Sequence, residues 1–395
     1  MNANQTVERA YRAATRRALP SLRRRLREVR NVVEVEAATI SNYPMPLRRR
    51  LWLWRHGFQS RNGALYDLDA HDPSQYLTDR QIERTPLING RWRTVFENKL
   101  VFHWMMRAFP ANRPAVHCAL REGHAVPIGP PAASEREGVP ATDESSGTTH
   151  AERGAEARGD PIDAAAWFAR EVSAGDRFVL KPIFGGFGDD VHICSKTDDG
   201  YVVGGDPKTP REFAEFVSDL DGYLVSEFAR QADYVDAIFP DAANTLRVIT
   251  MWDVDADEPF VPIAAHRIGT SHSAPLDNWS QGGMMAEVDV ETGELGPAAP
   301  KPSDGMEWYA RHPETGAQIE GVRIPGWEEI RERTLEITAS LPQAPYAGWD
   351  AIVTGEGEFV IIEGNNKPGL QAMQAYWPLL TDRRVRRFFE HHDVL

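Results

Sequence analysis

Residues 348–366, GWDAIVTGEGEFVIIEGNN, predict two short strands that carry side chains with hard oxygen atoms. Asp350 lies on the first strand, and Glu363 and Asn365 close the second. We call these three residues the predicted metal set, because Mg²⁺ takes one or two carboxylates together with phosphate oxygens and water. Gly364 is expected either to turn its two neighbours to one side or to mark a bulge. The other interpretation is a pair of surface carboxylates near a turn.

A lysine followed by glycines lies upstream, in RFVLKPIFGGFG at 177–188. Lys181 ends a short apolar strand, and Gly185, Gly186 and Gly188 form what we call the glycine loop. Backbone N–H groups of such a loop can approach phosphate oxygens closely, and the lysine adds a point charge. Protein kinases have the reverse order, and the chain contains no P-loop motif, so both classes are excluded. A glycine-rich hairpin without a ligand is the alternative.

Composition narrows the class of protein. The chain has 395 residues, 42% of them hydrophobic, which is enough for a sizeable core in two or three lobes. A formal net charge of -14 argues against a general nucleic-acid binder. Two distant cysteines favour a reduced, cytoplasmic location over a disulfide framework or a zinc ribbon. We expect no transmembrane segment, since no apolar run approaches the ~20 residues that one needs.

The N-terminal part has the opposite charge. Residues 1–61 contain fourteen arginines and four glutamates, a net of +10. Leu19, Leu22 and Leu26, spaced by three and four, predict a helix within 7–35. One interpretation is an amphipathic basic helix in peripheral contact with an anionic membrane or a partner. The other is a solvated surface helix that pairs with the protein's own acidic body.

The rest of the chain is expected to have four parts. Residues 62–128 hold short mixed segments and form an N-terminal lobe. Residues 129–160 contain almost no large apolar side chains, so we expect a disordered acidic insertion. Residues 161–235 form a small lobe with the lysine and the glycine loop, and 236–395 a large lobe with the metal and acceptor sites. The predicted strands are 177–182, 191–195, 201–203, 223–228, 246–252, 260–267, 285–290, 346–354 and 358–363, mostly antiparallel, which indicates an α+β fold.

These residues together resemble the ATP-grasp superfamily, and more narrowly its sugar-transfer-associated family, which is related to α-L-glutamate ligases. The resemblance runs from about Leu51 to the C-terminus and is interrupted by the insertion. It implies an ATP-grasp fold in which two α+β lobes clamp ATP, with an additional N-terminal lobe. The segments that carry it most specifically are ENKLVFH at 97–103, PDAANTLRVIT at 240–250, DNWSQGGMMAEVD at 277–289 and the stretch at 348–366.

The same resemblance implies roles for individual residues. Lys99 and Lys181 would bind the α- and β-phosphates of ATP, and the glycine loop would cover them. Glu227 would accept a hydrogen bond from the adenine amino group, and Phe228 would use its backbone at the ring edge. The predicted metal set would hold Mg²⁺.

The acceptor side of the site follows from the resemblance as well. Arg247 would face the γ-phosphate, because an arginine fork suits carboxylate or phosphate oxygens. Backbone N–H groups of a Gly-Gly turn can hold an oxyanion. For Arg267 a surface salt bridge is the alternative, and His266 is expected at the surface. The expected acceptor residues are Asn244, Arg247, Arg267, Asn278, Gly282 and Gly283.

These residues lead to a functional hypothesis with ATP and Mg²⁺ as cofactors. A carboxylate ligase would phosphorylate a small-molecule carboxylate, and an amine or other nucleophile would displace phosphate from the acyl phosphate. A kinase acting on a small-molecule or sugar hydroxyl is the first alternative. A non-catalytic nucleotide-binding subunit of a polysaccharide assembly system is the second. The sequence names neither the acceptor nor the oligomeric state.

Overall fold

The computed structural model describes residues 30, 33–34, 36–37, 40–128, 161–185, 190–302 and 305–395. Nearly all of the predicted helix within 7–35, the insertion 129–160, and Gly186 and Gly188 lie outside these residues. The chain packs as two units. Unit 1 comprises 1–96 and 231–395, and unit 2 comprises 97–230.

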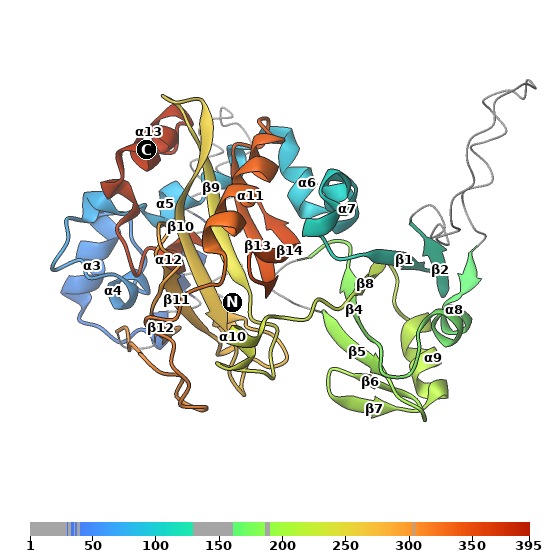
Figure 1. Ribbon diagram of the computed structural model, residues 1–395. Helices are drawn as coiled ribbons and strands as arrows, with labels where there is room; N and C mark the ends of the chain where they lie inside the picture. Colours follow the sequence, from blue (N-terminus) through green and yellow to red (C-terminus); the bar gives the residue numbers. More distant parts are fainter. Residues whose placement is uncertain are drawn as a thin grey trace, which may run out of the picture. The chain divides into compact units, whose positions relative to one another are not determined.

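Unit 1 is built on a six-stranded sheet in the order β12-β11-β10-β9-β13-β14, and every neighbouring pair is antiparallel (Figure 1). This arrangement agrees with the α+β class expected from the sequence. Within the described ranges, no helix combines the length and apolarity that crossing a membrane would require. The strands are β9 (Leu246–Asp253), β10 (Glu258–Ile268), β11 (Met284–Val288), β12 (Leu295–Pro300), β13 (Tyr346–Gly355) and β14 (Glu358–Asn365).

Helices cover both faces of this sheet. Side chains alternate along a strand, so Thr250 and Met251 of β9 point to opposite faces. Thr338 of α11 donates a hydrogen bond to Thr250 at 3.2 Å, whereas Met251 shares an apolar cluster with Phe388 of α13. The helices of unit 1 are α3 (Leu47–Arg55), α4 (Asn62–Leu65), α5 (Asp79–Ile82), α6 (Thr94–Glu97), α10 (Asp233–Asp236), α11 (Trp327–Ala339), α12 (Leu370–Met373) and α13 (Arg383–His391), with 3₁₀ turns η1 (Ile40–Asn42), η2 (Pro73–Gln75), η3 (Thr85–Leu87), η4 (Gly90–Arg93), η7 (Trp279–Gln281) and η8 (Leu379–Thr381).

Unit 2 contains an eight-stranded antiparallel sheet in the order β3-β2-β1-β8-β4-β5-β6-β7. Because β1 pairs with β8, the segment 97–128 packs with 161–230 rather than with 62–96. The five-part division drawn from the sequence stays a prediction. The elements are α7 (Lys99–Met105), η5 (Met106–Ala108), η6 (Pro110–Asn112), β1 (Val116–Arg121), β2 (His124–Pro127), β3 (Ile162–Asp163), α8 (Ala164–Glu171), β4 (Arg177–Pro182), β5 (His192–Lys196), β6 (Tyr201–Val203), β7 (Asp206–Lys208), α9 (Pro210–Ser218) and β8 (Tyr223–Glu227).

A buried carboxylate fixes the N-terminal helices of unit 1 to the C-terminal ones. Asp79, at the start of α5, accepts from the backbone N–H of Gln59 at 2.8 Å and from the amide of Asn62 at 2.7 Å. Arg61 and Gln371 donate to its other oxygen, each at 3.0 Å. A buried charge is tolerated only when it is paired and hydrogen-bonded, so these four donors depend on one side chain.

We predict that Asp79→Asn lowers the free energy of unfolding by about 3 kcal/mol, because it removes the charge and leaves buried donors without an acceptor. Urea titration followed by circular dichroism measures the change. The matched control is Asp69→Asn, since Asp69 is an exposed partner of Arg49 and its loss should cost less than about 1 kcal/mol. Equal effects of the two substitutions would contradict the assignment.

Candidate functional site

Five strands of unit 1 bring one residue each to the same level of the sheet. Glu363 pairs with Asp350, Asp350 with Arg247, Arg247 with Ala265, and Ala265 with Glu287. Residues directly paired across antiparallel strands project from the same face. We call these five residues the polar row. It sets three carboxylates beside an arginine on one face of the sheet.

A bulge puts Glu363 on that face. The pairing register shifts immediately after Asp350, so Ile362 is an extra residue between Ile361 and Glu363. Without this insertion, strict alternation would place Glu363 on the same side as buried Ile361. The bulge that was one of the two expectations for Gly364 is therefore at Ile362 instead. Ordinary alternation then places Asn365, two residues after Glu363, on the same face as Glu363.

Asp350 is the residue of the row that accepts the most hydrogen bonds from its neighbours. Arg247 grips its carboxylate with two N–H groups, of which Nη2 lies 2.8 Å from Oδ2. Arg267 Nη2 and Asn365 Nδ2 also donate to Oδ2, at 3.0 and 3.2 Å. Only 5% of the Asp350 side chain is exposed. Burial raises the pKa of this carboxyl, but the two guanidinium groups outweigh it and hold the pKa below its usual range.

Arg267 is held from a second side by Asp277. Its Nε donates to Thr245 Oγ1 at 2.8 Å and lies 3.6 Å from Asp277 Oδ2. The same carboxylate oxygen accepts from the backbone N–H of Thr245 at 2.7 Å and from its hydroxyl at 2.6 Å. Burial lowers the pKa of Arg267, but Asp277, Asp350 and Glu363 more than compensate and raise it. The guanidinium is consequently fixed and cationic, which excludes the surface salt bridge.

Glu287 is the carboxylate at the other end of the row. It is half-buried, and no described residue forms a hydrogen bond or ion pair with it. Burial, and next the charge of Asp289, raise the pKa of its carboxyl. Sequence reasoning missed both Glu287 and Asp277. Both lie in the segment DNWSQGGMMAEVD. Met285 pairs with Arg267 of the neighbouring strand, so alternation along β11 would have placed Glu287, two residues later, on the same face as this arginine.

Asn244 is placed as a supporting residue. Its side chain is buried, and its Nδ2 donates to the carbonyls of Phe239 and Ala242 at 2.7 and 3.1 Å. Its Oδ1 accepts from the backbone N–H of Gly269 at 2.7 Å. The amide therefore fixes the loops on either side of Thr245. A direct contact of Asn244 with substrate stays a prediction.

The Gly282-Gly283 pair belongs to a tight turn. Asn278 caps η7 through its side-chain oxygen, and Gly282 then has a φ of +106°. A Cβ on Gly282 would lie 2.9 Å from the Cβ of His272, and one on Gly283 would lie 2.4 Å from the carbonyl oxygen of Asp277. The turn thus needs both glycines for steric reasons. Contacts of these three residues with a substrate stay predictions.

His266 was expected at the surface, and that expectation is wrong. The imidazole is buried on the face of β10 opposite the polar row. Its Nδ1 donates to the carbonyl of Arg267 at 3.0 Å, so its Nε2 accepts from the hydroxyl of Tyr234 at 2.9 Å. Burial lowers the pKa of His266 to about 4, and the ring stays neutral as a packing element of the strand.

Three of the residues expected at the ATP phosphates, Lys99, Lys181 and Gly185, are described and belong to unit 2. Lys99 begins α7, which Asn98 caps, and its backbone N–H donates to the carbonyl of Ile183 at 2.9 Å. Its Nζ donates to the carbonyl of Gly185, also at 2.9 Å. Lys181 lies on β4, two residues before Ile183. The structure therefore joins Lys99 to the loop that follows Lys181.

Lys181 is one of three cations whose charges act on His103. Burial, and next the positive charges of Arg113, Arg107 and Lys181, together lower the pKa of His103 to about 4. Arg113 also approaches the imidazole at 2.8 Å. Such a concentration of positive charge suits a polyphosphate anion. Arg107 and Arg113 were not among the residues predicted from the sequence.

Of the two residues expected at adenine, Glu227 ends β8 and Phe228 directly follows it. Glu227 is exposed, and its Oε2 accepts from the backbone N–H of Ala115 at 3.1 Å. The guanidinium of Arg177 lies 3.7 Å from the centroid of the Phe228 ring. Contacts of Glu227 and Phe228 with adenine stay predictions. All residues expected to bind the nucleotide belong to unit 2, and the whole polar row belongs to unit 1.

The predicted metal set has the chemistry that Mg²⁺ needs. Among the described residues, no three His, Cys, Asp or Glu side chains gather as metal ligands. Asp350 and Glu363 nevertheless face each other across paired strands, with Asn365 on the same face. Oδ2 of Asp350 already accepts three donors, which leaves its Oδ1 as the better metal ligand. Two carboxylates and an amide oxygen fit Mg²⁺ when phosphate and water complete the shell.

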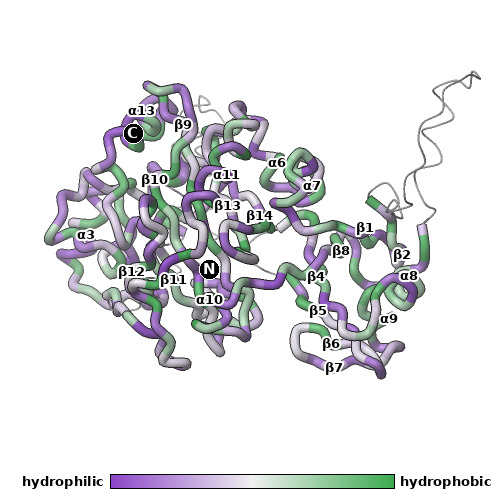
Figure 2. The backbone as a smooth tube through the Cα atoms, in the orientation of Figure 1, coloured by the Kyte–Doolittle hydropathy of each residue, from purple (hydrophilic) through white to green (hydrophobic). Residues whose placement is uncertain are grey.

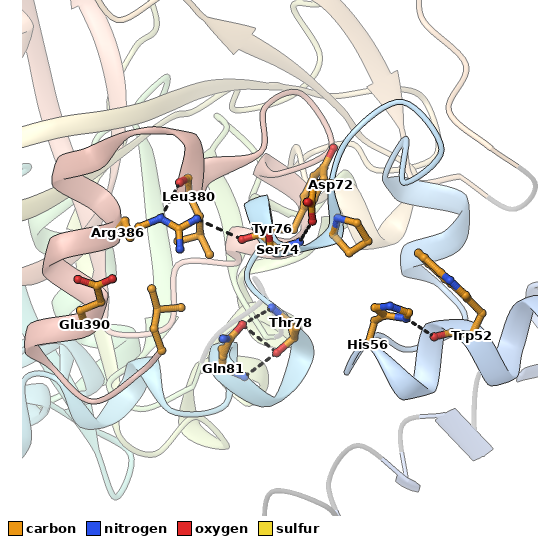
Figure 3. Close-up of a pocket in the computed structure, with 12 residues that line it drawn as sticks. Trp52, His56, Asp72, Ser74, Tyr76, Thr78, Gln81, Leu380, Arg386 and Glu390 are labelled. Atoms are coloured by element: carbon orange, nitrogen blue, oxygen red, sulfur yellow. Dashed lines mark hydrogen bonds between the residues drawn. The ribbon is translucent and has the colours of Figure 1, made fainter.

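A separate cavity of about 490 Å³ lies in unit 1 between α3, η2, α5, η8 and α13 (Figure 3). None of the residues predicted for the site lines it. Its polar groups are engaged locally: His56 Nδ1 lies 2.8 Å from the carbonyl of Trp52, and Arg386 donates to the carbonyl of Ser74 at 3.3 Å. We assign this cavity no part of the candidate site.

We predict that Asp350→Asn lowers the free energy of unfolding by about 3–5 kcal/mol at pH 7, because two buried guanidinium groups lose their common charge. The pKa of Asp350 is lowered in the folded state, so its stabilisation is present above the unfolded pKa of about 3.9 and is lost as pH falls through the folded value. The gap between variant and wild type should therefore shrink at low pH. Chemical unfolding at pH 7 and pH 3 measures it, and a gap independent of pH would refute the assignment.

The sugar-transfer associated ATP-grasp family matches residues 141–386. No curated protein matches the sequence. Solved structures give distant likenesses. The D-alanine-D-alanine ligase from Coxiella burnetii is 11% identical, with a TM-score of 0.32 over 76% of this chain and 59% of that one. The L-amino acid ligase from Bacillus licheniformis is 10% identical, with a TM-score of 0.32 over 72% and 43%.

An ADP complex of N5-carboxyaminoimidazole ribonucleotide synthetase gives a similar result, with 12% identity and a TM-score of 0.33 over 70% of this chain and 46% of that one. The chain thus spans about half the length of the solved structures that it matches. The assignment therefore rests on the sequence match, which covers more than half of the chain and includes the glycine loop, the polar row and the predicted metal set: the chain belongs to the sugar-transfer associated ATP-grasp family.

Proposed function

We propose that this chain is a MgATP-dependent ligase that activates a small-molecule carboxylate as an acyl phosphate for attack by an amine or another nucleophile. The observation that carries the proposal is the convergence of Arg247 and Arg267 on Asp350, on the face that also holds Glu363. Two fixed guanidinium groups suit a reaction that brings carboxylate and phosphate oxygens together. The family's description, sugar-transfer associated ATP-grasp, supports a product used in polysaccharide or sugar-conjugate biosynthesis.

The residues of this chain would act mainly by position and charge. Bound MgATP supplies the γ-phosphoryl group and a divalent cation that neutralises its oxygens. Lys99 and Lys181 hold the phosphates, while Arg247 and Arg267 orient the acceptor carboxylate toward γ-phosphorus. The carboxylate oxygen attacks phosphorus and ADP leaves. Since both guanidinium groups are held before substrate binds, little reorganisation opposes the transfer.

The second step needs a nucleophile, and Glu287 suits an amine. It lies two strands from Arg247 in the polar row, about 10 Å at ordinary strand spacing. A half-buried carboxylate without a cationic partner among the described residues attracts an ammonium group, and its raised pKa allows it to take the proton. The amine nitrogen then attacks the acyl carbon, the carbon–oxygen bond breaks, and phosphate leaves.

The first experiment searches for the substrates and tests the reaction. Fractionated metabolite pools are screened for ADP formation that needs two components, and the product is identified by mass spectrometry. With oxygen-18 in the acceptor carboxylate, we predict that one labelled oxygen appears in the released phosphate, because that oxygen bridges carbon and phosphorus in the acyl phosphate.

Two controls bracket this result. Glu363→Gln, which removes one carboxylate of the predicted metal set, should give no ADP above background and thus excludes a contaminating ATPase. A product that retains the phosphoryl group, with no free phosphate, would replace the ligase by a kinase acting on a hydroxyl. ATP binding without ADP formation from any pool would support the non-catalytic subunit.

For the nucleophile we predict that Glu287→Gln lowers kcat/KM on the order of 10²-fold, the usual contribution of a positioned acid–base group, with unchanged affinity for ATP. Steady-state kinetics with the identified substrates and ATP titration by calorimetry measure the two quantities. The control is Glu294→Gln, an exposed neighbour paired with Arg323, which should change neither. Unaltered turnover in Glu287→Gln would remove this residue from the reaction.

A further inference from the structure

Helix α3 exposes an apolar stripe. Leu47, Leu51 and Trp54 are 64%, 49% and 41% exposed, and their spacing of four and three puts them on one side of the helix. Leu53 points the other way and is fully buried beside Phe58, so the helix is anchored to unit 1 by its opposite side. Hydrophilic and hydrophobic residues alternate along α3 (Figure 2), which lies at the edge of unit 1 (Figure 1).

Arginines flank this stripe. Arg48 and Arg55 are exposed and seven residues apart, which places them along one border of the stripe. No carboxylate among the described residues pairs with either of them. The other two arginines of the helix, Arg49 and Arg50, are held by ion pairs within the protein. The helix contains no acidic residue at all.

We propose that α3 docks the protein on an anionic phospholipid surface. The two leucines and Trp54 enter the boundary between headgroups and acyl chains, where tryptophan is favoured. Arg48 and Arg55 extend toward lipid phosphates, each adding an attraction that salt screens. The helix lies in the plane of the surface and does not cross the bilayer.

Charge favours a lipid surface over two other candidate partners of the stripe, which are residues 1–29 of the same chain and α3 of a second copy. Residues 1–29 contain eight arginines and two glutamates, so packing them on α3 would bring like charges together. A second copy of α3 would set its arginines against Arg48 and Arg55. An anionic surface matches both the apolar stripe and its basic border, and it attracts residues 1–29 as well.

Binding of the full chain to vesicles tests the proposal. The vesicles are phosphatidylcholine alone or with about a third of phosphatidylglycerol, a surface charge of biological order. We expect cosedimentation with the anionic vesicles only, reduced at high salt. The combined substitution Leu47→Ala, Leu51→Ala and Trp54→Ala keeps every charge and should lower the partition coefficient at least about tenfold, because it removes the inserted apolar area.

Leu87→Ala combined with Trp104→Ala is the matched control, since each of these side chains is 49% exposed outside the stripe. It should bind like the wild type. If the stripe variant also binds like the wild type, the attraction comes from the basic N-terminal residues alone and the proposal is overturned. Equal loss in both variants overturns it too, because insertion would then not be specific to α3.

A dye on the helix gives a readout that does not depend on affinity. Cys118 and Cys194 are buried, and burial raises the pKa of both thiols, that of Cys194 to about 12, so a thiol reagent should label Leu51→Cys selectively. The fluorescence emission of an environment-sensitive dye at this position should shift to shorter wavelength when anionic vesicles are added. The emission of the same dye on Leu87→Cys should not shift. A shift already present without lipid would show that protein covers the stripe and would overturn the proposal.

Discussion

The carboxylate of Asp350, shared by two arginines, is the interaction on which the candidate site depends. Arg247 and Arg267 come from neighbouring strands and both donate to Asp350, and without Asp350 the guanidinium of Arg247 would lose its ion-pair partner. Asp277 supplies the second counter-charge for Arg267. With Glu363, the cluster holds three carboxylates and two guanidinium groups, so it keeps a small negative charge that a divalent cation can neutralise.

Strand register is the device that assembles this cluster. A single extra residue, Ile362, turns Glu363 from the helix α11 side of the sheet to the side of Asp350. Ala265 stands between Arg247 and Glu287 in the row. Its methyl group is small and leaves space between these two side chains. In the proposed reaction, this one small side chain would separate the end of the row that binds the carboxylate from the end that binds the amine, without a loop having to position either.

The sequence predicted the strands better than the contacts between distant segments. The strand expected at 246–252 is β9, Leu246–Asp253, and the one expected at 358–363 is β14, which continues to Asn365. The pairing of β1 with β8 was missed, because its mixed segment lies about a hundred residues from its partner. Asp277 and Glu287 were missed for a related reason: strand register places Glu287 on the face of the arginines, and the loop before η7 brings Asp277 to Thr245.

In the segment Asn244-Thr245-Leu246-Arg247, residues that hold the surrounding backbone and loops stand next to an arginine of the candidate site. Asn244 fixes the adjacent loops, Thr245 orients Asp277, and Arg247 grips Asp350. A polar residue in such a motif is thus no evidence of ligand contact by itself, since two of the three polar side chains, those of Asn244 and Thr245, form hydrogen bonds within the protein. What they secure is the direction of Arg267, through the Thr245 hydroxyl and the Asp277 carboxylate. Both guanidinium groups are therefore aimed by buried hydrogen bonds before any substrate arrives, which is the preorganisation that phosphoryl transfer exploits.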